Sequence, residues 1–129
     1  MVNPVAVEND AMTKGPRILV AEDIWLTAQE LVSTLADIGA SVVGPASSLL
    51  EAKHLVATET VDCAVLDIDL EGRAAYPVAA ELERRSVPII FVTGYENPHL
   101  PPSLRRYPLL KKPFAPERLQ ELIRQSCMV

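Results

Sequence analysis

The chain contains five short aliphatic runs that do not alternate with polar residues, and this pattern limits its fold more than any other feature. The runs lie at residues 18–21, 40–43, 63–66, 87–92 and 109–110, and the last is the weakest. A strand with one solvated face alternates apolar and polar residues, whereas a strand covered on both faces is apolar throughout. The runs therefore predict buried strands of a parallel sheet.

Amphipathic segments separate these runs and have the spacing of helices. The first places apolar residues three and four positions apart and stops at Gly39. Ser48 and Glu51 have the spacing of a helix capping box, and Pro77 and Pro116 suit first helical positions. Strands and helices thus alternate about five times, which predicts an α/β domain with helices on both faces of the sheet.

The segment after the fourth run is unusually rich in proline. Six of the eleven prolines in the chain lie between positions 98 and 116. Proline inside a helix removes a hydrogen bond and clashes with the preceding turn. We therefore expect a short or irregular fourth helix, at most a turn around residues 103–106.

Length, charge and cysteine content narrow the class of protein. A chain of 129 residues with 49% hydrophobic residues suits one domain, which we expect at residues 17–126 after a flexible leader (1–16) and before a short tail (127–129). The net charge of −5 argues against a nucleic-acid surface, and no apolar run reaches membrane length. Cys63 is expected in the core and Cys127 as a free thiol near a frayed end, which fits a reducing cytoplasm.

Residues with useful chemistry follow four of the five predicted strands. In chain order they are Glu22 and Asp23, Asp67, Thr93, and Lys112. Ligands of open parallel sheets bind beyond the carboxyl ends of the strands, so we expect these side chains at one rim. Clustered carboxylates repel one another unless a cation lies among them, and Mg²⁺ prefers oxygen ligands together with a substrate phosphate. The pattern predicts a metal-assisted phosphoryl site.

Simpler interpretations of the same residues stay open at this point. Asp67 could cap the loop after its strand, and Thr93 could form a turn with the glycine that follows it. Asp62 and Asp69 flank Asp67 and compete for its role. Asp62 precedes the apolar run and belongs at the opposite end of the strand, whereas Asp69 projects from the following loop.

Four motifs resemble those of response-regulator receiver domains, the phosphoacceptor domains of two-component signalling. They are ILVAED at the first strand, VLDIDL at the third, FVTGY at the fourth and KKPF at the fifth. Each is weak alone, but together, in this order, they form a strong signal over residues 17–126. The resemblance implies a flavodoxin-like (βα)5 three-layer sandwich with strand order 2-1-3-4-5.

The resemblance assigns a nucleophile and a metal site. Asp67 would attack the phosphoryl donor and form an aspartyl phosphate. Mg²⁺ would be bound directly by Asp23 and Asp67, through water by Glu22, and by the backbone carbonyl of Asp69. The side chain of Asp69 lies where such domains tune dephosphorylation, and an ordinary solvated loop charge is an equal alternative.

Two further residues would contact the phosphoryl oxygens, which carry the charge of a loose transition state. Lys111 and Lys112 point to opposite faces of a strand, so only one can reach the site. The proline that follows, together with the family pattern, selects Lys112. Thr93 would donate its hydroxyl to another oxygen.

The resemblance also implies partners and a setting. The donor would be a sensor histidine kinase or a phosphotransfer protein, and the output a downstream protein target. Neither nucleic acid nor membrane is expected as a partner. The chain would be a cytoplasmic signalling phosphoacceptor and not an enzyme, present as a monomer or weak homodimer. It ends soon after the fifth predicted helix, as single-domain regulators do.

The sequence departs from the family near the fifth strand. Many receivers have an aromatic switch residue where this chain has Leu109, and Tyr107 is two positions away. The proline-rich segment 97–108 has few apolar anchors and is a candidate replacement that would order on phosphorylation. FVTGY is similar to the Phe-Ala-Thr-Gly motif of regulators paired with HWE-type histidine kinases, with Val92 in place of alanine.

Three other functions compete with that of a phosphoacceptor. A degenerate receiver would bind partners constitutively, but the full set of site residues argues against it. A small phosphohydrolase of haloacid-dehalogenase type needs its aspartyl nucleophile and a second Asp two residues later at the first strand, where this chain has Glu22-Asp23-Ile24-Trp25. A flavin or nucleotide binder needs a glycine-rich loop that is absent after the first strand.

Overall fold

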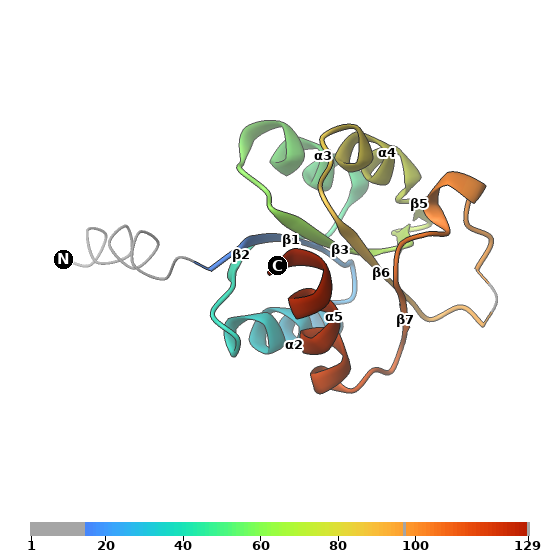
Figure 1. The fold of residues 1–129 in the computed structure, drawn as a ribbon. Coiled ribbons are helices and arrows are strands. Elements are labelled where there is room, and N and C mark those ends of the chain that lie inside the picture. Colours follow the sequence, from blue (N-terminus) through green and yellow to red (C-terminus); the bar gives the residue numbers. More distant parts are fainter. Residues whose placement is uncertain (1–14, 97, 129) are drawn as a thin grey trace.

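The computed structural model describes residues 15–96 and 98–128 and contains a central five-stranded parallel sheet (Figure 1). Its order is β2-β1-β3-β6-β7, which in chain order is the predicted 2-1-3-4-5. The strands are β1 (Arg17–Ala21), β2 (Ser41–Ala46), β3 (Cys63–Asp67), β6 (Ile89–Thr93) and β7 (Leu109–Lys111). The flavodoxin-like prediction is confirmed, while most of the predicted leader lies outside the described residues.

Two pairs of helices cover the two faces of the sheet (Figure 1). One face carries α2 (Trp25–Ala36) and α5 (Pro116–Cys127), and the other carries α3 (Leu49–Thr58) and α4 (Tyr76–Arg84). Within the described residues, no helix is long and apolar enough to cross a membrane.

Burial on both faces explains why the strands are apolar throughout. Leu19 and Leu66 belong to the core under α3 and α4, whereas Ile18 and Val65 belong to the core under α2 and α5. All four side chains are completely buried. Neighbouring residues of one strand thus enter different cores, and neither face tolerates a polar side chain.

In the described part of the connection between β6 and β7, the one helical element is the short 3₁₀ helix η1 (Pro102–Leu104), as the prolines predict. This connection has more apolar contacts with the core than we expect from its sequence. Leu100 and Leu104 are buried, and the ring of Tyr107 meets that of Phe91 edge-on with 6.3 Å between the centroids. The exposed side chain of Leu109 makes no such contact with the core, so Tyr107 is the aromatic residue that packs beside β6.

An antiparallel hairpin that the sequence did not predict lies between β3 and α4. It consists of β4 (Asp69–Leu70) and β5 (Arg73–Ala74), with Asp69 paired to Ala74. The two residues of its turn, Glu71 and Gly72, have φ angles of 54° and 81°. Positive φ at both central positions is what a type I′ turn requires, and such turns match the twist of a hairpin.

The expectation of a free thiol at Cys127 is wrong. Cys127 is the last residue of α5 and forms a disulfide with Cys63, the first residue of β3, with 5.8 Å between their Cα atoms. The two cysteines are separated by 64 positions, and only the packing of α5 on the sheet brings them together. The cysteines therefore no longer support a reducing compartment by themselves.

Candidate metal and phosphoacceptor site

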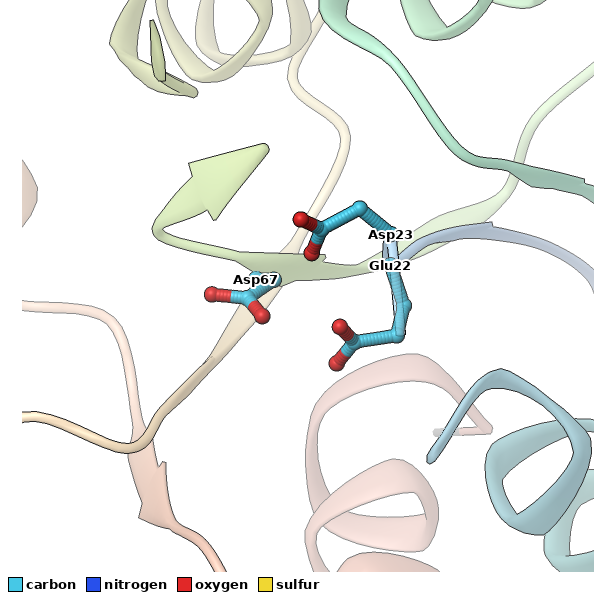
Figure 2. A group of neighbouring side chains, drawn as sticks. All are labelled: Glu22, Asp23 and Asp67. Atoms are coloured by element: carbon cyan, nitrogen blue, oxygen red, sulfur yellow. The ribbon is translucent and has the colours of Figure 1, made fainter. Parts of the chain in front are cut away.

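Three carboxylates meet at the carboxyl ends of β1 and β3 (Figure 2). Because Ala21 of β1 pairs with Leu66 of β3, the residues that follow them, Glu22 and Asp67, come to lie side by side. Glu22, Asp23 and Asp67 each place a carboxylate oxygen within 4.8 Å of the others. Glu22 is 1% exposed and Asp67 6% exposed, so two of the three acids are largely removed from water.

Lys112 supplies the positive charge at this cluster. Its Nζ lies 2.7 Å from Oδ2 of Asp67 and 2.7 Å from Oε1 of Glu22. The backbone N–H of Lys112 donates to the carbonyl of Thr93 at 2.7 Å, which fixes the residue beside the end of β6. Lys111 instead forms an ion pair with Glu96 at the surface. Of the two neighbouring lysines, Lys112 therefore lies at the carboxylate cluster and Lys111 does not.

Burial disfavours the charged forms of both Glu22 and Lys112, and it therefore acts on their pKa values in opposite directions. Removal from water raises the pKa of Glu22 to about 7, although Lys112 and the backbone N–H of Ile24 act to lower it. Burial also acts to lower the pKa of Lys112, but its interactions with the Asp67 and Glu22 carboxylates outweigh that effect and the pKa is raised. Near neutral pH, Lys112 is therefore charged while Glu22 is close to its titration point.

Backbone N–H groups hold one oxygen of each carboxylate. Ile24 donates to Oε2 of Glu22, and Asp69 donates to Oδ1 of Asp67, both at 3.0 Å. Glu71, at the tip of the β4–β5 hairpin, donates to Oδ2 of Asp23 at 3.0 Å. Sequence analysis could not identify these donors because a backbone N–H has no side-chain signature. The only available signal was the Glu71-Gly72 pair, which indicates a turn.

Thr93 and Asp69 are linked by a residue that the sequence analysis did not assign to the site. Thr93 ends β6, is 1% exposed, and accepts a hydrogen bond from the backbone N–H of Tyr95 at 3.0 Å. The hydroxyl of Tyr95 donates to Oδ2 of Asp69 at 3.2 Å. The side chain of Asp69 is thus turned toward Tyr95 and is not part of the three-carboxylate cluster.

The position of Asp62 excludes it as a competitor of Asp67 for the role of nucleophile. Its Oδ2 accepts a hydrogen bond from the backbone N–H of Arg17 at 2.8 Å, at the amino end of the sheet. Asp62 is therefore at the opposite end of β3 from Asp67, as predicted. Asp67 also does more than cap a loop, because it contacts Lys112 as well as the N–H of Asp69.

The donor set of the cluster fits a hard divalent cation such as Mg²⁺. All candidate ligand atoms are carboxylate oxygens, which Mg²⁺ prefers. Oε1 of Glu22 is buried and, among the described residues, accepts no hydrogen bond, although Lys112 lies at ion-pair distance. A buried carboxylate oxygen without a hydrogen bond is costly, and a cation or its water would satisfy it.

The fold and this site together define a flavodoxin-like α/β domain with an acidic, lysine-paired centre at the carboxyl ends of its strands. The model of the response regulator receiver domain matches residues 18–124, and the chain belongs to this family.

Comparisons with individual proteins agree with this assignment. The transcriptional regulatory protein PdtaR of Mycobacterium tuberculosis is 29% identical over 82 residues, 63% of this chain and 40% of the relative. The response regulator PhyR from Brucella abortus is 26% identical with a TM-score of 0.75, covering 98% of this chain and 53% of that one. SdrG from Sphingomonas melonis Fr1 is 29% identical with a TM-score of 0.78, and the match covers 89% of this chain and 98% of SdrG. The matched part of the chain thus spans about half the length of PhyR and less than half that of PdtaR. It spans nearly all of SdrG.

Proposed function

We propose that the chain is a Mg²⁺-dependent phosphoacceptor, phosphorylated on Asp67 by a histidine kinase or a phosphotransfer protein. The observation that carries the proposal is the position of the Asp67 carboxylate, which lies within 4.8 Å of two further carboxylates and 2.7 Å from the ammonium group of Lys112. A nucleophile beside a cation site and a fixed positive charge has what phosphoryl transfer requires, namely positioning and charge stabilisation.

The proposed reaction uses the residues of the site as follows. An oxygen of Asp67 forms a bond to phosphorus, the phosphorus–nitrogen bond of a phosphohistidine breaks, and the imidazole leaves with the electron pair. Glu22, Asp23 and Asp67 would hold Mg²⁺, which supplies positive charge to the phosphoryl oxygens when bound. Lys112 would move from Asp67 to a phosphoryl oxygen, and Thr93 would donate its hydroxyl to another.

Signal output would follow from the same contacts. Thr93 and Lys112 are joined by a backbone hydrogen bond, so a shift of either toward phosphate would move the ends of β6 and β7 together. The connection that contains η1 lies between these two strands and would carry the change to the surface. A downstream protein would bind the altered surface. The chain would therefore act as a signalling switch and not as an enzyme.

We further propose a cytoplasmic monomer or weak homodimer that receives its phosphoryl group from an HWE-type kinase. The similarity of FVTGY to Phe-Ala-Thr-Gly supports this choice of donor.

Intact-mass measurement after incubation with acetyl phosphate tests the proposal. The wild-type chain with Mg²⁺ should gain the mass of one phosphoryl group, and the gain should disappear in Asp67→Asn. Asp62→Asn is the matched control, because Asp62 lies at the other end of the same strand and should not affect labelling. A wild type that gains no phosphoryl mass even when hydrolysis is slowed would favour a constitutive binding module.

A further inference from the structure

The β4–β5 hairpin makes a contact with the site that family membership does not explain. Its tip lies against Asp23, 48 positions earlier in the chain, through the hydrogen bond from the N–H of Glu71. We propose that the hairpin is a positioning element, which holds the Asp23 carboxylate in the orientation that binds the divalent ion. This inference rests on the proposed metal site and names the residues that preorganise it.

The base of the hairpin is rigidly attached to the sheet. Ile68, between β3 and β4, is buried and its N–H donates to the carbonyl of Val92 in β6 at 3.1 Å. Leu70 is completely buried in the core under α3 and α4. The N–H of Ala75 returns to the carbonyl of Ile68 at 2.7 Å and closes the hairpin before α4. The tip is therefore held at a fixed height above the carboxyl end of β3.

The tip itself is exposed, and its conformation depends on one glycine. Glu71 and Gly72 are both exposed, so burial does not hold them in place. Gly72 has a φ of 81°, which glycine adopts easily and β-branched residues do not. A Cβ atom at Gly72 would meet nothing within 4 Å. A side chain at this position would therefore act through the backbone conformation of the turn and not through a clash.

Asp23 needs such a contact more than the other two acids do. Glu22 and Asp67 are buried and paired with Lys112, whereas Asp23 is half-exposed and is not among the partners of that lysine. A half-exposed aspartate next to two other carboxylates is driven by repulsion to turn into solvent. The N–H of Glu71 opposes this rotation by engaging Oδ2, which leaves Oδ1 free for a ligand.

Mg²⁺ affinity tests the proposal and can be measured by titration calorimetry and by the fluorescence of Trp25, which lies two positions after Asp23 in the chain. Gly72→Val should weaken Mg²⁺ binding about tenfold, because the strain of a β-branched residue at positive φ is relieved by a different turn in which Glu71 no longer faces Asp23. Gly72→Asn should bind nearly as well as wild type, because asparagine tolerates this conformation.

Gly39→Val is the matched control for loss of stability. Gly39 has a φ of 83° and equally open surroundings, but it lies after α2, at the opposite end of the sheet. Both valine variants should lose thermal stability to a similar extent, and only Gly72→Val should lose Mg²⁺ affinity. Equal Mg²⁺ affinities in the two variants would overturn the positioning role, as would equal losses in Gly72→Val and Gly72→Asn.

Amide exchange provides a second test that needs no metal and no altered turn. In Asp23→Ala the acceptor is lost, so the N–H of Glu71 should exchange about tenfold faster while that of Ala75 is unchanged. Unchanged exchange at Glu71 would contradict the proposal even if Gly72→Val did not fold. Failure of the wild type itself to bind Mg²⁺ would instead overturn the proposed function, so the two failures are distinguishable.

Discussion

Removal of the Lys112 charge should destabilise the fold in the absence of a divalent ion and make its stability depend on that ion. In Lys112→Met the stem of the side chain is retained, but the Asp67 and Glu22 carboxylates, each 2.7 Å from Nζ, lose their partner. Breaking a buried ion pair by removing one partner costs about 3–5 kcal/mol. The lower end applies here, about 3 kcal/mol, because Glu22 can take up a proton at its raised pKa.

Urea unfolding at pH 7.5 in the presence of a chelator measures this cost, and Lys111→Met is its control. Lys111 precedes Lys112 in the chain and pairs with Glu96 at the surface, where the Glu96 side chain is 79% exposed. Exposed pairs contribute at most about 1 kcal/mol, so this variant should remain close to wild type. Mg²⁺ should then recover most of the stability lost in Lys112→Met, since a bound cation replaces the missing charge.

The pH dependence of the same variant provides an internal check. At pH 5 the cost should be smaller than at pH 7.5, because more of the Glu22 population is protonated in the folded state. If Lys112→Met is as stable as Lys111→Met at pH 7.5 without Mg²⁺, the interpretation of Lys112 as the buried counter-charge of the site is refuted.

Three further predictions concern other parts of the domain. In wild type without Mg²⁺, the contribution of Glu22 to the free energy of unfolding is fully present below pH 4.5 and is lost as pH rises toward 7, because its pKa is raised from 4.5 to about 7 in the folded state. Glu22→Gln should remove this pH dependence of the free energy of unfolding, measured by urea titrations. Cys127→Ser should lower the melting temperature of the oxidised protein by on the order of 10 °C in calorimetry and leave that of the reduced protein nearly unchanged, because the link to Cys63 closes a long loop. Tyr95→Phe removes the donor to Asp69 and should change the decay rate of the phosphorylated form several-fold, followed by intact mass, without affecting the melting temperature by more than about 2 °C.

The fold and the principal site were predictable because their causes are periodic or local. Continuous apolar runs specify strands buried on both faces, and strands that all run the same way bring their carboxyl ends to one edge. The positions of Glu22, Asp67 and Lys112 at this edge then follow from their places at the end of a strand or directly after it. The alternation of side chains shows that only one of Lys111 and Lys112 can reach the site, and the following proline together with the family pattern selects Lys112.

The features that sequence analysis missed depend on long-range packing or on the backbone. Cys63 and Cys127 meet only because α5 lies across the sheet, which the spacing of two cysteines cannot indicate. The contact of Glu71 with Asp23 uses a backbone N–H, and any residue at position 71 would supply it. The sequence shows Tyr95 only as part of a family motif. The contact of its hydroxyl with Asp69 depends on how the segment after β3 is placed beside the end of β6.

Location of the phosphoryl group tests the central claim most directly. After incubation with acetyl phosphate and Mg²⁺, the chain is treated with borohydride, which reduces an acyl phosphate, and its peptides are sequenced by mass spectrometry. We predict that the reduced residue is Asp67 and that omission of Mg²⁺ abolishes the modification. Modification of Asp23, Asp62 or Asp69 instead, or labelling of Asp67 that is equally fast without Mg²⁺, would contradict the account.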